Sequence, residues 1–415
     1  MKIGAGKQEI NFPENFFPTE GFSRVAAPLY VRAAILCDTM EIAILSVELT
    51  SLPPEEISAL KKIISEETNI LEKNCWICVT HTFSAPHILP DAVLSTDEMY
   101  YKKEILKESL YRAVREAVCY AKEQLTEVQL KVGRSQCFVN VNRDFETPDG
   151  WWVSNCGEGF SDKTLHVISA EDASSKHKVI FVHYSVQSSV LEGSELLEGG
   201  KVVSGDLVGV MCTELEKEYP GAAAIFLLGA AGDQAPIYKA KTMTLTEEGK
   251  LIEKDAHDEG IGLCHSLGMK MAESAKEAVA SAAINQKGNL TVASADFLIP
   301  TKKMNRNLHE LKPTRFYEYV PEGEQEITIE TIKIGNIALL GVKPELNSRT
   351  AQKILDQSPF ETTLIMTMVN GGAKYMADMD SYDRFTYEAM NSPFARGAAE
   401  ILCEQAVLLL HNTCS

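Results

Sequence analysis

One order of elements recurs three times along the chain, and this recurrence restricts the possible fold most. Two β-rich runs joined by a short turn are followed by an amphipathic helix and then by one more apolar strand. The sequence therefore predicts an α/β fold of mixed β-sheets with flanking helices, built from repeated hairpin-helix-strand units. The paired runs and closing strands are 29–36, 41–47 and 75–79; 164–169, 179–182 and 224–228; and 326–334, 337–342 and 362–368.

Each unit has polar residues where its strands end, the usual place for site residues in an α/β sheet. If the units pack around one centre, at least three of these side chains are expected to meet in one cleft. The other reading is that such an order is simply common in mixed α/β proteins. The six residues are Glu48 and His81, His183 and Asp233, and Glu345 and Tyr375.

The stretch THTFSAPH at 80–87 follows the apolar run 75–79 and ends near Pro86, which cannot continue a strand ladder. His81 is therefore expected where a strand meets a loop. Two readings are open: a site residue, or a strand-end histidine with a structural hydrogen bond. Cys75 and Cys78 form a CxxC pattern without a second copy, and in a strand their side chains point to opposite faces. We interpret the pair as structural.

Composition excludes some partners. The net charge is −18, which argues against nucleic acid and anionic membranes. The N-terminus has no apolar signal region and no apolar run is long enough to span a membrane. We therefore expect a cytoplasmic protein with ten free cysteines, no membrane insertion and possible self-association. No linker-like tract interrupts the chain, so residues 1–415 are predicted to form a single domain.

Three further segments read as long amphipathic helices, at 99–125, 261–280 and 394–411. Segment 144–159 reads as a loop, and its Trp151 and Trp152 either line a substrate mouth or pack the loop down. Neither a P-loop nor a GxSxG elbow is present. Metal-assisted hydrolysis by a His, Glu and Tyr cluster fits better.

A set of short motifs in one order resembles the N-terminal catalytic domain of the neutral ceramidase family. Any one of them is weak, but the full order is fairly specific to the family and covers nearly the whole chain. The motifs are GAGKQEIN (4–11), THTFSAP (80–86), NVNR (140–143), FVH (181–183) with SGD (204–206), GAAGDQAP (229–236), KPE (343–345) and the segment from Tyr375 to Tyr387-Glu388.

The resemblance implies hydrolysis of a linear amide C–N bond with a bound zinc or another divalent metal. Carried over residue by residue, it places metal ligands at His81, His183, Glu345 and Tyr375. Catalytic residues fall on Arg143, Tyr387 and Asp233. From the residues alone, His183 at the end of an apolar run would be a satisfied core histidine, and its place among the motifs favours a ligand instead. Arg143 could equally pair with a nearby acid, Tyr387 could pack in the core, and Asp233 could be a helix cap or a turn residue.

The chain departs from the family pattern at Phe83 and Ala235, and we expect no C-terminal Ig-like domain of the kind that the family has. Ceramide is therefore not the expected substrate. The first hypothesis is a metal-dependent hydrolase of a small amide-type substrate. The alternative is an inactive family member that binds a small polar ligand in the same cleft. Among the histidines, His183 and not His166 is expected to reach the metal.

Overall fold

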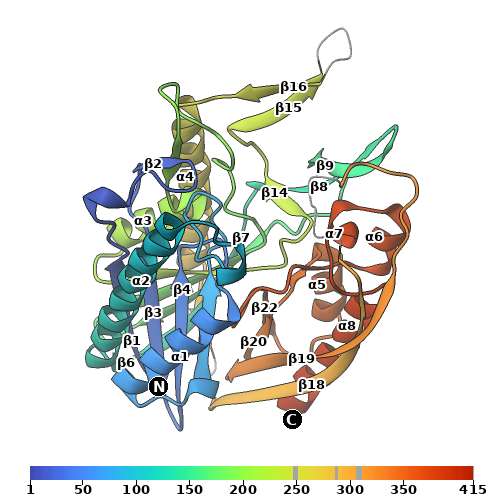
Figure 1. The fold of residues 1–415 in the computed structure, drawn as a ribbon. Helices are drawn as coiled ribbons and strands as arrows, with labels where there is room; N and C mark the ends of the chain where they lie inside the picture. The colour runs from blue at the N-terminus through green and yellow to red at the C-terminus, as the bar shows by residue number, and fades with distance from the viewer. Residues whose placement is uncertain (246–250, 286–287, 305–310, 415) are drawn as a thin grey trace.

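A computed structural model describes residues 1–245, 251–285, 288–304 and 311–414, and it contains three larger β-sheets with helices outside them (Figure 1). The first sheet has the order β5-β4-β3-β1-β6, the second β13-β11-β10-β7-β17 and the third β18-β19-β20-β22. Their strands are β1 (Lys2–Glu9), β3 (Tyr30–Cys37), β4 (Glu41–Val47), β5 (Cys75–Val79), β6 (Thr126–Glu127), β7 (Gln129–Gln136), β10 (Thr164–Glu171), β11 (His177–Tyr184), β13 (Ala223–Leu228), β17 (Ala283–Ile284), β18 (Leu290–Lys302), β19 (Pro321–Ile334), β20 (Ile337–Val342) and β22 (Thr362–Met366).

Each of the three sheets contains an antiparallel hairpin whose second strand is joined through a helix to a parallel neighbour. The hairpins are β3–β4, β10–β11 and β19–β20, and the parallel neighbours are β5, β13 and β22. The connecting helices are α1 (Pro54–Thr68), α3 (Asp206–Glu218) and α5 (Ser348–Leu355). The predicted mixed α/β class is confirmed, and a crossover of this kind brings the carboxyl ends of the two parallel strands to one edge.

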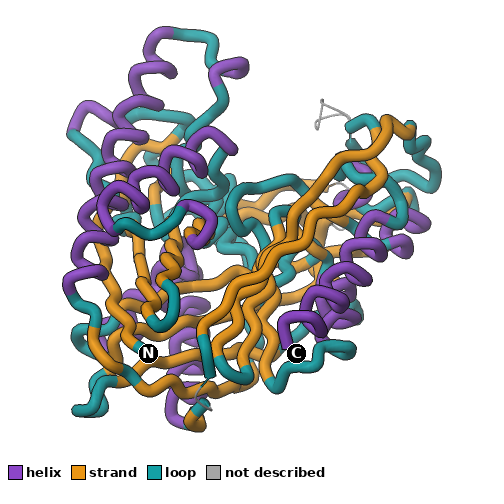
Figure 2. Tube along the Cα trace, turned by 90° about the horizontal axis from the view of Figure 1, so that it is seen from below, coloured by secondary structure: helices purple, strands orange, loops and turns teal. Residues whose placement is uncertain are grey.

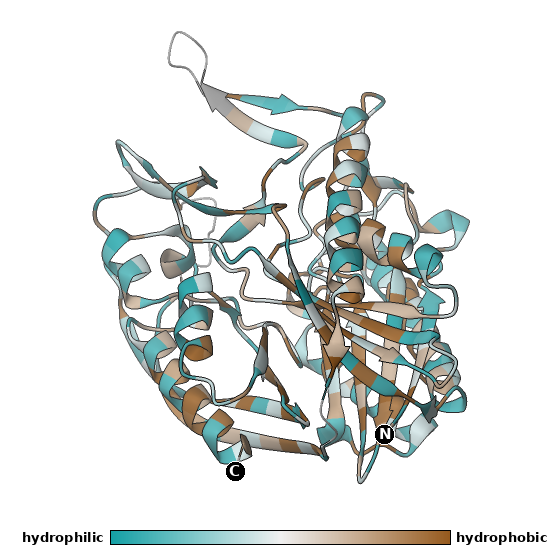
Figure 3. Ribbon diagram, turned by 180° about the vertical axis from the view of Figure 1, so that it is seen from behind, coloured by the Kyte–Doolittle hydropathy of each residue, from teal (hydrophilic) through white to brown (hydrophobic). Residues whose placement is uncertain are grey.

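Helices cover the outer faces, and apolar side chains from all three sheets meet between them. One core cluster contains Ile44 of the first sheet, Phe181 of the second and Leu339 of the third. In Figure 3 the strands at this junction are brown, whereas the helices show teal outward faces. Seen from below, helices lie on both sides of the strands (Figure 2). The remaining helices are α2 (Asp97–Glu123), α4 (Glu259–Ala280), α6 (Met379–Arg384), α7 (Tyr387–Met390) and α8 (Ala398–Cys414).

Local sequence explains where the first helices begin and end. Helix α1 starts with Pro54 at its first position and ends at Asn69, whose φ of 60° is the left-handed C-cap conformation. Helix α2 is capped by Thr96, whose side chain accepts from the Met99 amide. Gly6 lets α2 approach β1 closely, because a Cβ there would lie 2.2 Å from the Ala117 carbonyl oxygen.

Four smaller sheets complete the fold of the described residues. Segment 144–159, predicted as a loop, instead falls largely in an antiparallel hairpin in which Trp152 of β9 pairs with Phe145 of β8. Aromatic residues favour strands, and the loop interpretation gave that preference too little weight. No described helix is long and apolar enough to cross a membrane. Three of the four smaller sheets have two strands and the fourth has the order β14-β8-β9. Their strands are β2 (Phe22–Val25), β8 (Asn140–Thr147), β9 (Gly150–Cys156), β12 (Lys201–Val203), β14 (Gln234–Pro236), β15 (Lys241–Leu245), β16 (Leu251–Asp255), β21 (Glu345–Leu346) and β23 (Tyr375–Met376).

The CxxC pattern is structural, as predicted. Cys75 and Cys78 both lie in β5 as free, buried thiols, and they belong to two different core clusters on opposite faces of the strand. Burial raises the pKa of each thiol to about 12. A thiol that stays protonated at neutral pH is a poor nucleophile and a poor metal ligand.

This arrangement predicts a selective alkylation pattern. In the folded protein at pH 8, Cys75 and Cys78 should react with iodoacetamide at least about 100-fold more slowly than the exposed Cys414, because both access and thiolate fraction are low. Peptide mass spectrometry over a time course measures the three rates. Equal labelling of Cys75 and Cys414 would restore the redox reading of the motif.

Candidate functional site

His81 lies in the loop directly after β5 and is almost fully buried. Its backbone φ of 57° is left-handed, which is uncommon for a residue other than glycine and is found more often at functional sites. Its Nδ1 lies 2.6 Å from the Thr50 carbonyl oxygen, to which it donates. That bond directs Nε2 away from Thr50, and Nε2 has no hydrogen-bond partner.

Glu345 faces this nitrogen. Its Oε2 lies 3.3 Å from His81 Nε2 and accepts a 3.0 Å hydrogen bond from Gln187 Nε2. Burial on its own would lower the pKa of His81, but the Glu345 carboxylate outweighs it and the pKa is raised. Burial likewise opposes ionisation of Glu345, yet His81 and Arg143 together lower its pKa. Both effects favour a charged His81–Glu345 pair.

Arg143 is buried at the centre of the cluster and contacts three partners. Its Nε and one terminal nitrogen approach Glu388 Oε1 at 2.8 and 2.7 Å. Its other terminal nitrogen donates to Gln187 Oε1 at 2.9 Å. The guanidinium also packs against the Tyr375 ring. Arg143 therefore pairs with an acid, which is one of the two interpretations drawn from the sequence. Its contacts also link β8 to three other segments.

Two tyrosines and a tryptophan enclose the guanidinium. The Arg143 carbon Cζ lies 5.2 Å from the ring centre of Tyr375 and 5.8 Å from that of Tyr387, distances typical of cation–π contacts. Tyr387 packs edge-on against Tyr375 at 5.9 Å and against Trp152 at 5.5 Å. Burial, followed by the Glu345 charge, raises the pKa of Tyr375, so its hydroxyl stays protonated at neutral pH.

Three of the six strand-end residues meet, as expected. His81 faces Glu345, and Glu345 and Tyr375 are register neighbours in the β21–β23 pair. Glu48 does not take part, because its carboxylate accepts from Arg32 and from the Tyr30 amide. That buried ion pair supports the first sheet.

Asp233 lies beside the cluster and accepts hydrogen bonds from the first residue of α5. Its carboxylate accepts from the Ser348 amide and hydroxyl, each at 2.8 Å, and from Asn142 Nδ2 at 3.1 Å. Burial raises the pKa of Asp233 to about 6 against the effect of these bonds. The observed contacts match the helix-cap reading of Asp233, and its catalytic role stays a prediction.

The structure does not bring His183 into the cluster. The alternation of β11 puts His183 on the same face as Phe181, toward the core between the sheets. Its Nε2 lies 2.9 Å from the Ile365 carbonyl oxygen, and its ring stands 6.1 Å from that of His166, its register partner. Within the described ranges, no hydrogen bond, ion pair or ring contact joins either histidine to His81, Glu345 or Tyr375.

The zinc site implied by the sequence does not fit these residues. A catalytic zinc takes at least three protein lone-pair donors. His81 and Glu345 supply two at one point, but the Tyr375 phenol beside them packs against the Arg143 guanidinium, His183 is elsewhere and Gln187 directs its NH₂ group toward Glu345. Across residues 1–245, 251–285, 288–304 and 311–414, no group of three or more His, Cys, Asp or Glu side chains is arranged to hold a metal ion.

A polar cavity of about 360 Å³ is lined by Asp144 and Asp233, whereas His81, Glu345 and Arg143 do not line it. Asp144 also lies near Glu388, which in turn holds Arg143. Burial, then Glu388 and Asp233, raise the pKa of Asp144 well above its usual range. Trp151 also lines the cavity, with the Arg384 guanidinium 4.5 Å from its ring, and its place at a substrate mouth stays a prediction.

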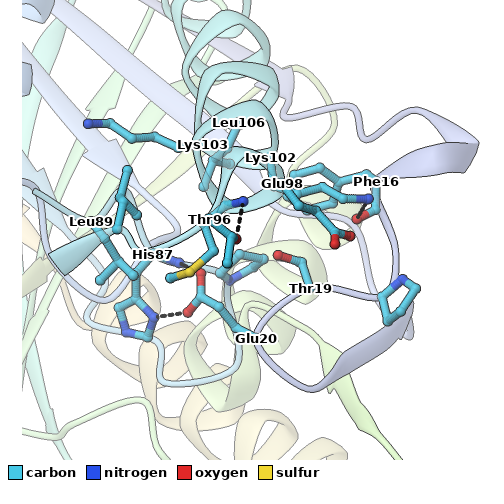
Figure 4. Close-up of a pocket in the computed structure, with 14 residues that line it drawn as sticks. Phe16, Thr19, Glu20, His87, Leu89, Thr96, Glu98, Lys102, Lys103 and Leu106 are labelled. Carbon is cyan, nitrogen blue, oxygen red and sulfur yellow. Dashed lines mark hydrogen bonds and ion pairs between the residues drawn. The ribbon is translucent and has the colours of Figure 1, made fainter. Parts of the chain in front are cut away.

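A second cavity, of about 280 Å³, lies between α2 and the segment that follows the His81 loop (Figure 4). His87 on its wall bonds Glu20 at 2.6 Å, and Phe16, Leu89 and Leu106 supply apolar surface. None of the seven predicted site residues lines it. It is separate from the polar cluster.

Sequence reasoning missed Gln187 and gave Glu388 no role. Glu388 carried a signal, since it follows Tyr387 in a motif already quoted. Gln187 carried none, because it lies beyond the end of β11 in a segment without regular secondary structure.

Comparison with known proteins identifies the fold. No family model and no curated protein matches the sequence. Among solved structures, the chain is similar to neutral ceramidase from Pseudomonas aeruginosa, with a TM-score of 0.75 and 14% identity over 99% of this chain and 74% of that one. It is also similar to a ceramidase complexed with C2, with a TM-score of 0.74 and 14% identity over 100% and 75%. The resemblance drawn from the motifs is therefore confirmed at the level of the fold.

Proposed function

We propose that this chain, which has the fold of the neutral ceramidases, is an amide hydrolase that acts on a small polar N-acyl substrate. The observation that carries the proposal is the buried pair of His81 and Glu345. His81 Nε2 has no hydrogen-bond partner and faces the carboxylate at 3.3 Å, with Arg143 one side chain away. Buried, perturbed acid–base pairs that face a charge-stabilising group cluster at catalytic sites.

Each residue has a role that its contacts support. A water oxygen attacks the amide carbonyl carbon while its proton passes to the Glu345 carboxylate of the charged pair, which leaves negative charge on the carbonyl oxygen. Arg143 or Tyr387 holds that oxygen. The C–N bond then breaks and the proton goes to the departing nitrogen, giving a carboxylic acid and an amine. Thr50 keeps the His81 ring oriented through Nδ1.

The adjacent cavity suggests the size of the substrate. Its volume of about 360 Å³ is near the lower end of the range for ligand sites. Its wall carries Arg349, Asp378 and Arg384, which suit a polar molecule better than two long hydrocarbon chains. A cytoplasmic location, a single domain over 1–415 and self-association stay predictions.

The polar residues that line this cavity suggest a test of the substrate class. The purified protein is assayed against a panel of N-acetyl and N-formyl amines and amino acids, alongside long-chain ceramide, with released amine as the readout. We expect turnover of at least one small amide and a ceramide rate at least about 100-fold lower. A ceramide rate above that of every small amide would refute the substrate class.

A second function is favoured by a specific observation. Gln187 and Phe83 put an amide and a phenyl ring beside His81 where a hydrolase could use further acid–base groups; the Phe83 ring lies 4.7 Å from the His81 ring. A binding protein without turnover is therefore the alternative. A panel compound that raises the melting temperature but releases no amine would select it.

A further inference from the structure

The position of Gln187 decides whether a metal ion can bind beside His81 and Glu345. The side chain is buried, and it lies between Arg143 and Glu345 with one amide atom directed at each. A guanidinium has only donors, so the amide atom 2.9 Å from Arg143 is the oxygen. The NH₂ group must then face Glu345, at 3.0 Å, where a carboxylate accepts it. The chemistry of the two partners thus fixes the amide orientation.

The NH₂ group that faces Glu345 cannot serve as a metal ligand, because its nitrogen lone pair is delocalised into the amide. Rotating the amide to offer its oxygen would turn two donors, those of Gln187 and Arg143, toward each other. It would also remove a donor from Glu345. Gln187 therefore offers no lone pair to a metal ion held by His81 and Glu345.

The other two candidate ligands do not replace it. The Arg143 guanidinium lies 5.2 Å from the Tyr375 ring centre, and its positive charge opposes a divalent cation beside that phenol. His183 is bonded to the Ile365 carbonyl in the sheet core. The separation of 3.3 Å between His81 Nε2 and Glu345 Oε2 suits either a proton shared by the two groups or a metal ion bound by both. Because zinc needs at least three protein ligands, the lack of a third donor favours the shared proton.

We propose that this cleft works without a resident metal ion, because Gln187 occupies the place of a third protein ligand and leaves His81 and Glu345 as a directly interacting pair. This inference concerns the site of the proposed function but not its substrate. It holds or fails on metal affinity, whatever the outcome of the amide assays.

The experiment is a competition between zinc and a chromogenic chelator at fixed pH, since ligand protonation competes with the metal. Wild type should bind zinc weakly, and His81→Ala should bind it equally weakly. Gln187→His should bind at least ~100-fold more tightly than wild type, because it supplies the missing donor beside His81 and Glu345. Gln352→His is the matched control: it adds an imidazole beside the Asp356 carboxylate on α5 and should leave the affinity unchanged.

Three outcomes would overturn the proposal: wild type that retains one zinc per chain against the chelator, a loss of ten-fold or more on His81→Ala, or no gain on Gln187→His. Should Gln187→His fail to fold, the comparison of wild type with His81→Ala still decides the matter. The His183→Ala variant should match wild type in every arm, since that ring lies outside the cleft.

Discussion

Replacing Glu345 with glutamine should lower turnover of the small amide that the panel identifies by about 10²–10⁴-fold, the usual contribution of a positioned acid–base group. The amide keeps the shape of the carboxylate and can still accept from Gln187 Nε2. It cannot carry the negative charge that faces His81 at 3.3 Å. Steady-state kinetics should show the loss mainly in kcat/KM.

Two measurements make this result specific. Glu361→Gln changes an exposed carboxylate beside the start of β22 that bonds Asn336, and its activity should equal that of wild type. The circular dichroism spectrum of Glu345→Gln should be unchanged. Activity of Glu345→Gln within ten-fold of wild type would remove the His81–Glu345 pair from the mechanism.

Replacing Arg143 with alanine should lower the free energy of unfolding by about 3–5 kcal/mol, as expected when one member of a buried ion pair is removed. Glu388 is fully buried and would lose both guanidinium contacts. Gln187 would lose a donor and Tyr375 a cation–π contact as well. Urea denaturation with linear extrapolation measures the change.

The control is Arg396→Ala, which breaks an exposed pair with Asp383 and should leave the urea midpoint within experimental error. Adding Glu388→Gln to Arg143→Ala should recover part of the lost stability, because the uncompensated charge is then gone. An Arg143→Ala midpoint equal to that of Arg396→Ala would show that the buried network contributes little.

Much of the fold could be predicted because its signals are local. The hairpin β19–β20 turns at Gly335 and Asn336, and α1 begins at a Pro-Pro pair, so neighbouring residues alone specify both. The hairpin β8–β9 was missed since glycine and acidic residues around it read as irregular chain.

The site was predictable only in part, for a physical reason. His81, Glu345 and Tyr375 stand at strand ends, where alternation and topology aim side chains at a shared edge. His183 also ends a strand, but alternation places it with Phe181 on the core face, one residue short of the edge. Gln187 reaches the cleft from irregular chain, which has no periodicity to read.

The contacts of Arg143 also determine when the site can exist during synthesis. Arg143 and Glu388 are 245 positions apart, and Gln187 and Glu345 are 158 apart. Contacts of such separation require large loops to close, so they form late and slow the folding of a chain. A nascent chain would expose the guanidinium of Arg143 to water until the segment bearing Glu388 had left the ribosome. Assembly of the cleft is therefore among the last folding events, and an incomplete chain would have β-sheets without a site.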